Sequence, residues 1–204
     1  MTRTRTGSSR GGAAGARLTG VSVNPQLSPR EDVVLVDREG TVLGGVARSQ
    51  VRRDNLLHAA TAVLVRNGSG EIYVHRRSPD KDWAPAHHDA YAGGMLRVGE
   101  EPAPSARREL AEELGIEGDV ALVPLGHNLY EDEHTRCRES VFEATWDGPV
   151  RFADHEVVCG SWMTLQELGI RLRDPAWPFV PDTRQLLGGL AEQGVRDYAA
   201  LGLG

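Results

Sequence analysis

One stretch of 23 residues, from Gly94 to Ile116, places the tightest limits on what this chain can fold into. Within it, Glu109, Glu112 and Glu113 are spaced at i, i+3 and i+4. On an α-helix this spacing puts three carboxylates on one face, where they repel one another. A hard divalent cation bound by carboxylate oxygens relieves that repulsion. The stretch therefore predicts a helix with one acidic, metal-binding face.

The residues around the glutamates predict where this helix begins and ends and how it packs. Pro102 and Pro104 suit the first turn, and Gly115 suits the position just past the end. An apolar stripe at i, i+4 and i+8 is offset from the glutamates and consists of Ala106, Leu110 and Leu114. A glycine-bounded loop before the helix can bring Glu100 back toward the carboxylates, and Arg108 can pair with one of them.

The rest of the chain predicts a mixed α/β fold (α+β). Alternating apolar residues and turn signals indicate two hairpins, at 32–44 and at 57–75, and further strands at 121–130, 138–146 and 157–163. Residues 76–91 are expected to form a loop, and 165–170 and 181–201 are expected to form helices. Because hairpins join several strands while helices lie between others, a mixed sheet with helices on both faces is favoured over a doubly wound parallel sheet.

Charge and composition narrow the function classes. Residues 1–30 contain five arginines and no acid, so a net charge of −6 leaves −11 on residues 31–204. We expect 1–30 to be a disordered basic tail and 31–204 to be a single domain whose acidic surface disfavours nucleic acid. The sequence has no apolar run long enough to predict a membrane span and no apolar segment typical of a secretory signal, so we expect a cytoplasmic protein. The two cysteines, Cys137 and Cys159, are expected to be buried free thiols in strands.

The stretch at 94–116 resembles the Nudix box, G-x5-E-x7-R-E-U-x-E-E-x-G-U, in which U is a bulky aliphatic residue. All nine fixed positions match: Gly94, Glu100, Arg108, Glu109, Leu110, Glu112, Glu113, Gly115 and Ile116. The resemblance implies a Nudix-type α/β/α sandwich with a mixed sheet, in which the box forms a loop–helix–loop. It also implies Mg²⁺-dependent hydrolysis of a nucleoside diphosphate linked to another group, or of a similar small diphosphate.

The resemblance also implies roles for individual residues. The metal would be Mg²⁺, with Mn²⁺ as an alternative. It would be held by Glu109, Glu112 and Glu113, joined by a backbone carbonyl at Gly93 and by Glu100. Glu112, Glu113 and Arg108 form the expected catalytic set. Members of the family often take a general base from outside the box, which leaves three candidates: Glu133, Glu139 and Glu156.

A second resemblance, to the Nudix branch related to isopentenyl-diphosphate isomerase, covers about residues 32–190. In that branch an arginine and a lysine, placed like Arg77 and Lys81, hold the substrate diphosphate, as charge-assisted contacts allow. Those isomerases also need a cysteine and a histidine where this chain has Ala92 and Gly94. Hydrolysis is therefore favoured. Isomerase-like activity and a non-catalytic diphosphate-binding module remain as alternatives, and a homodimer is compatible with the sequence.

Overall fold

The structure is a computed structural model that describes Met1 and residues 32–152 and 155–203. Apart from Met1, the predicted basic tail at 1–30 lies outside the described residues. The elements in chain order are β1 (Asp32–Val36), β2 (Val42–Ala47), α1 (Arg48–Asp54), β3 (His58–Arg66), β4 (Ile72–Arg77), β5 (His88–Asp89), β6 (Tyr91–Met95), α2 (Pro102–Leu114), β7 (Leu122–Glu131), β8 (Arg136–Thr145), β9 (Val157–Met163), α3 (Leu165–Arg173), α4 (Pro181–Glu192) and η1 (Tyr198–Leu201).

Strand β3 is the centre of a mixed sheet. It pairs in parallel with β8 and antiparallel with β6, and β7 extends the sheet beyond β8. The hairpin of β1 and β2 joins through the pair Leu35 and His58. A second group of strands consists of β4 between β5 and β9 and meets β3 only at the pair Arg66 and Ile72. The sheet therefore opens between β3 and β4.

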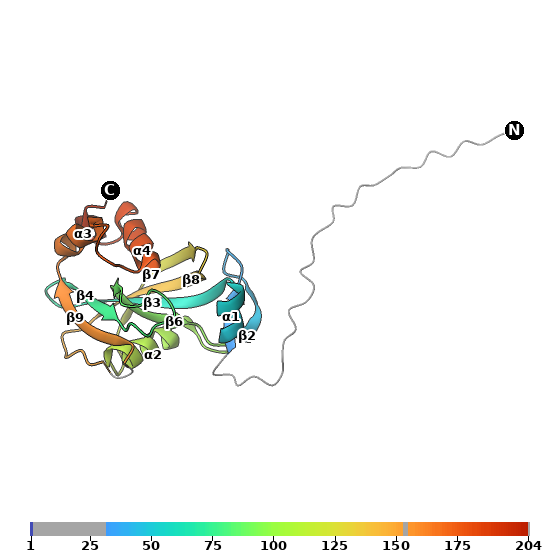
Figure 1. The fold of residues 1–204 in the computed structure, drawn as a ribbon, viewed down its shortest axis with the longest axis horizontal. Helices are drawn as coiled ribbons and strands as arrows, with labels where there is room; N and C mark the ends of the chain where they lie inside the picture. The colour runs from blue at the N-terminus through green and yellow to red at the C-terminus, as the bar shows by residue number, and fades with distance from the viewer. Residues whose placement is uncertain (2–31, 153–154, 204) are drawn as a thin grey trace.

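The side chains of β3 alternate between two buried layers. Ala62 and Leu64 belong to a core shared with α3, α4 and η1, whereas Val63 and Val65 belong to a core shared with α2. A strand buried on both faces is expected to be mostly apolar, and the run from Ala62 to Val65 in the middle of β3 is. Figure 1 shows the result, with α3 and α4 on one side of the strands and α2 on the other. The predicted α/β/α sandwich with a mixed sheet is confirmed.

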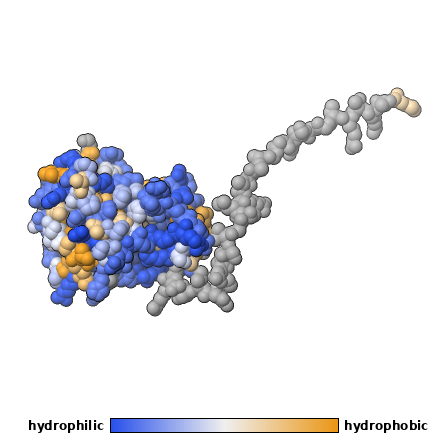
Figure 2. Space-filling view, in the orientation of Figure 1, coloured by the Kyte–Doolittle hydropathy of each residue, from blue (hydrophilic) through white to orange (hydrophobic). Residues whose placement is uncertain are grey.

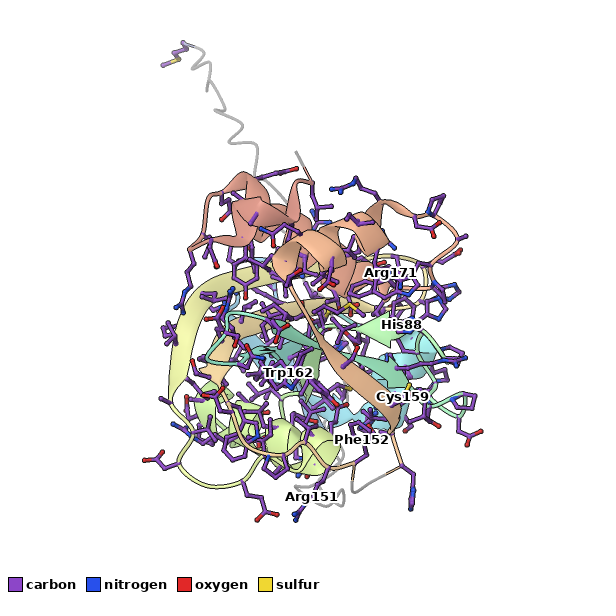
Figure 3. All side chains as sticks on the ribbon, turned by 90° about the vertical axis from the view of Figure 1, so that its left-hand side faces the viewer. His88, Arg151, Phe152, Cys159, Trp162 and Arg171 are labelled. Atoms are coloured by element: carbon purple, nitrogen blue, oxygen red, sulfur yellow. The ribbon has the colours of Figure 1, made fainter. Side chains whose placement is uncertain are left out.

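Three local predictions are wrong. Residues 57–75 do not form a hairpin, because β3 and β4 separate immediately after their single pair and take different partners. The helix predicted over 181–201 ends at Glu192, and the chain reverses at Gly194, whose φ is +63°. Cys137 is buried as expected, but Cys159 is exposed on β9, where it is labelled in Figure 3.

The surface is mostly polar in the view of Figure 2, and it is strongly hydrophilic over α1. That helix contributes Arg48 and Arg53 to the outside of the molecule, whereas Arg52 is half-buried. Within the part of the chain that is described, no helix is both long and apolar enough to cross a membrane.

Candidate functional site

Helix α2 carries the predicted acidic face and is held firmly by its other side. Ala106, Leu110 and Leu114 are buried against the sheet, as the apolar stripe predicts. Gly115 ends the helix in the left-handed conformation with a φ of +60°, and its N–H bonds to the Ala111 carbonyl. A Cβ at Gly115 would lie 2.7 Å from the carbonyl oxygen of Arg151, so both the backbone and the packing require glycine here.

Two glycines of β6 allow the strand to lie directly against the acidic face. A Cβ on Gly94 would lie 2.7 Å from the carboxyl carbon of Glu109, and one on Gly93 would collide with the carbonyl oxygen of Thr61. The Gly93 N–H donates to Glu113 at 3.3 Å. The backbone of β6 and the carboxylates of α2 are therefore in direct contact.

Arg108 holds the carboxylates on the outer part of this face. Its Nε and Nη2 donate to the two oxygens of Glu100 at 2.8 and 3.0 Å, and its Nη1 lies 2.5 Å from Glu109 and 3.0 Å from Glu112. Burial alone would raise the pKa of Glu100, but the bonds from Arg108 outweigh it and lower that pKa. The predicted return of Glu100 and the pairing of Arg108 are both confirmed.

Glu113 lies deeper and contacts different partners. Its side chain is 2% exposed, and burial raises its pKa to about 8, although Lys81 opposes the shift. The Nζ of Lys81 is 3.4 Å from Glu113 and also contacts Glu156, which comes from the segment before β9. Lys81 thus connects the loop after β4, the acidic helix and a carboxylate that is distant in sequence.

Most of these residues line one cleft, whose chemistry fits a hard divalent cation. Besides residues of β1 and α1, the cleft is lined by Lys81, Gly93, Gly94, Met95, Arg97, Arg108, Glu109, Glu112 and Glu156, and the buried Glu113 lies next to it through its contact with Lys81. Carboxylate and carbonyl oxygens are the donors that Mg²⁺ prefers. The close approach of Gly94 to Glu109, which a Cβ would block, brings backbone oxygens of β6 near that donor set. Glu109, Glu112 and Glu113, with the Gly93 carbonyl, can therefore hold such an ion.

A second cavity adjoins the cleft and shares Arg48, Lys81, Gly93, Gly94 and Met95 with it. Arg77 lines this cavity rather than the cleft. Its guanidinium lies 3.4 Å from the Asp89 carboxylate and donates to the Trp83 carbonyl at 3.0 Å.

The floor of the second cavity contains acidic groups from β8 and α4. Among the described residues, one set of three possible metal ligands lies within 4.8 Å of one another: Cys137, Glu139 and Asp182. Burial raises the pKa of Glu139 to about 8 and that of Asp182 to about 6. The Tyr91 hydroxyl lies between the two carboxyls, 2.8 Å from Glu139 and 3.0 Å from Asp182.

The structure separates the three candidate general bases. Glu156 lines the cleft beside Glu109 and Glu112. Glu139 lies in the second cavity, and Glu133 lies at a hairpin tip with its side chain 86% exposed. Sequence reasoning named Glu156 without ranking it and did not find the grouping of Cys137 with Asp182. The only sequence signal for that grouping was an acid two residues after a cysteine on one strand.

The mixed sheet, the loop–helix–loop and its acidic cleft define a Nudix fold. A model of the NUDIX domain family matches residues 56–187, and the chain belongs to that family. It is 43% identical over 171 residues to the Nudix hydrolase orf19 of Rhodococcus erythropolis, covering 79% of this chain and 92% of that protein. It is 36% identical over 162 residues to the Nudix hydrolase YfcD of Escherichia coli K12, covering 79% and 87%.

Solved structures agree with this assignment. DR0079 from Deinococcus radiodurans superposes with a TM-score of 0.66 at 27% identity, covering 76% of this chain and 96% of that chain. A MutT protein from Methanosarcina mazei shares the fold with a TM-score of 0.58 at 20% identity, covering 69% and 96%. The chain is therefore a Nudix-type hydrolase.

Proposed function

We propose that this hydrolase cleaves the diphosphate bond of a nucleoside diphosphate linked to another group, or of a similar small diphosphate, and that it depends on Mg²⁺. The observation that carries the proposal is the cleft between β6 and α2, which Glu109, Glu112 and Lys81 line, with Lys81 also 3.4 Å from the buried Glu113. Glu109, Glu112, Glu113 and the Gly93 carbonyl would hold the ion. Once bound, Mg²⁺ supplies charge neutralisation at the phosphoryl oxygens and lowers the pKa of a coordinated water.

The side chains around the cleft then bind the phosphates, accept the proton of the attacking water and orient the metal ligands. Lys81, which contacts Glu113 and Glu156, would donate to a phosphate oxygen, and Arg77 would bind the far phosphate from the second cavity. Glu156 accepts the proton of the attacking water as the new P–O bond forms and the bridging P–O bond breaks. Glu100 acts by fixing Arg108, which in turn orients Glu109 and Glu112.

The finer assignments also belong to this proposal. Placement in the branch related to isopentenyl-diphosphate isomerase is supported by the position of Arg77 and Lys81 at adjoining cavities. This chain nevertheless has Ala92 and Gly94 where those isomerases need a cysteine and a histidine, so we propose hydrolysis rather than isomerisation. A cytoplasmic location and a small-molecule substrate are part of the same proposal.

The test is a substrate panel combined with one matched pair of variants. Nucleoside triphosphates, dinucleotides, sugar nucleotides, thiamine diphosphate and prenyl diphosphates are assayed with Mg²⁺ and with Mn²⁺. Glu113→Gln should lower kcat at least about 100-fold, because it removes several kcal/mol of charge stabilisation at the transition state. Glu117→Gln changes an exposed glutamate three residues beyond the helix and should leave activity unchanged.

The alternatives have distinct outcomes in the same panel. Wild-type turnover in Glu113→Gln would reject the mechanism. Tight diphosphate binding without metal-dependent product release would indicate a binding module. Incorporation of solvent deuterium into a prenyl diphosphate would indicate isomerisation.

A further inference from the structure

One end of the sheet face that α2 covers is left open. Val63 and Val65 of β3 pack against this helix, and Ala59 lies on the same face because the side chains of a strand alternate. Pro102, the first residue of α2, lines a groove together with Ala59, so the helix stops short of this end of the sheet. The groove has a volume of about 620 Å³, which is within the range of small-molecule sites.

The hairpin of β1 and β2 and the loop before α2 give the groove an apolar wall. Val34, Val36 and Leu96 form a small buried cluster behind this wall. Val42 and Val98 lie at its rim, where they are 66% and 44% exposed. Apolar side chains that remain exposed around a concave surface are typical of a binding site.

The opposite wall, formed by β7 and β8, is polar and has donors without partners. Arg138, Ser140 and His127 share one face of the sheet, because Ser140 pairs with His127 and lies two residues from Arg138. The Nε of Arg138 donates to the Arg38 carbonyl at 3.2 Å. Among the described residues, the two Nη groups of Arg138 have no hydrogen-bond partner, and no carboxylate forms an ion pair with this guanidinium.

The charges at the two ends of the groove differ. Arg138 lies at the end next to the turn between β1 and β2, since a Cβ on Gly40 in that turn would be 3.0 Å from its guanidinium. Glu100 and Glu101 lie at the end next to α2, where Glu100 already accepts two hydrogen bonds from Arg108. A single guanidinium balances one negative charge, and the two glutamates repel any further anionic group.

We propose that this groove binds a free amphiphile that consists of one carboxylate and an apolar chain, as in a fatty acid. The carboxylate pairs with the Nη groups of Arg138, whose planar fork matches two oxygens, and the chain lies along the apolar wall. The groove is separate from the catalytic cleft, because Val33 of β1 lines the cleft whereas Val34 and Val36 line the groove. The proposal does not depend on the hydrolase mechanism.

The test is isothermal titration of the full-length chain with octanoate, below the concentration at which it forms micelles. Octanoate should bind at one saturable site, and acetate, which has no chain, should give no binding. The affinity for 1-octanol should be at least about tenfold lower, because an alcohol forms no charge-assisted pair with Arg138. No saturable binding of octanoate, or tighter binding of octyl phosphate than of octanoate, would overturn the proposal.

Matched variants locate the bound carboxylate. Arg138→Gln should weaken octanoate binding at least about tenfold and remove the preference for octanoate over 1-octanol. Arg171→Gln makes the same charge change on α3, which Figure 1 shows on the opposite side of the molecule from β2, and should leave binding unchanged. Unchanged octanoate binding in Arg138→Gln, or an equal loss for octanoate and 1-octanol, would reject the site. Circular dichroism confirms that each variant has folded.

The apolar wall is tested at its rim. Val42→Ser changes an exposed side chain and should weaken the binding of octanoate and of 1-octanol alike, by about threefold, because it removes apolar contact area. Light scattering of the wild-type protein and of Val42→Ser examines a different occupant, a second copy of the chain. A wild-type dimer that Val42→Ser converts to a monomer would overturn the proposal.

Discussion

At the scale of single residues, Arg108 organises the acidic cleft. It contacts Glu100, Glu109 and Glu112 at once, and it also donates to Ser105 at 3.1 Å. Only a planar guanidinium presents enough donors in fixed directions for this set. Its neighbour Arg107 is more exposed and contacts the Val120 carbonyl and Asp119, and no box carboxylate among the described residues.

This contrast predicts that Arg108→Lys retains the charge but lowers kcat/KM about 10- to 100-fold, because Glu109 and Glu112 lose their orientation. The same change at Arg107 should have no effect on kcat/KM. The measurement is steady-state kinetics over a range of Mg²⁺ concentrations. If Arg108 positions the metal ligands, Arg108→Lys should need a higher Mg²⁺ concentration for half-maximal activity. An equal loss of kcat/KM in Arg108→Lys and Arg107→Lys would refute this role.

At the scale of elements, two helices contain glycines that differ in what surrounds them. Gly188 lies within α4, and a Cβ there would meet no atom within 4 Å. Gly169 lies within α3, where a Cβ would collide with the Leu201 carbonyl of η1. The glycine in α3 therefore allows the C-terminal turn to pack closely, whereas the one in α4 has no such packing reason.

We expect Gly188→Ala to stabilise the fold by about 0.5–1 kcal/mol, because alanine loses less backbone entropy in a helix. In a domain of this size that corresponds to a Tm increase of about 2–4 °C. Gly169→Ala should instead lower Tm by displacing η1. Thermal unfolding followed by circular dichroism measures both changes, and shifts of the same sign would contradict the packing argument.

At the scale of the whole molecule, buried ionisable groups make stability depend on pH. Burial raises the pKa of Glu113 and of Glu139 to about 8. Such carboxyls hold their protons more tightly in the folded protein than in the unfolded chain, where their pKa is about 4.3. Their contribution to stability is therefore fully present below about pH 4.3 and is lost as the pH rises toward 8. Burial lowers the pKa of His58 and His75 to about 4, so they reduce stability only below about pH 6.5.

In the presence of a chelator, the free energy of unfolding should therefore fall between about pH 6.5 and 8, where only the carboxyls act. Glu139→Gln should reduce that fall, because its amide does not titrate. Urea denaturation at several pH values measures the effect. A free energy of unfolding that does not change over this pH range would contradict the raised pKa values of Glu113 and Glu139. A fall in Glu139→Gln as large as in the wild-type protein would contradict the raised pKa of Glu139.

Much of the site could be predicted from one stretch of sequence because its contacts are local. The helical face of Glu109, Glu112 and Glu113, the glycine at its end and the return of Glu100 to Arg108 all lie within 94–116. By contrast, the partner of β3 could not be predicted, since two apolar strands beside a glycine-rich turn resemble a hairpin whether or not they pair. Long-range sheet pairing is set by the cores on both faces, and local sequence does not encode it.

The sequence by itself determined the family, the acidic helix and the type of cation that it suits, because these depend on residue spacing along one helix and its flanking loops. Only the tertiary structure decided that Glu156, rather than Glu133 or Glu139, lines the cleft beside Glu109 and Glu112. It alone brought Cys137, Glu139 and Asp182 together from β8 and α4. The physical reason is that these groups meet only when the mixed sheet opens between β3 and β4 and the helices cover its two faces.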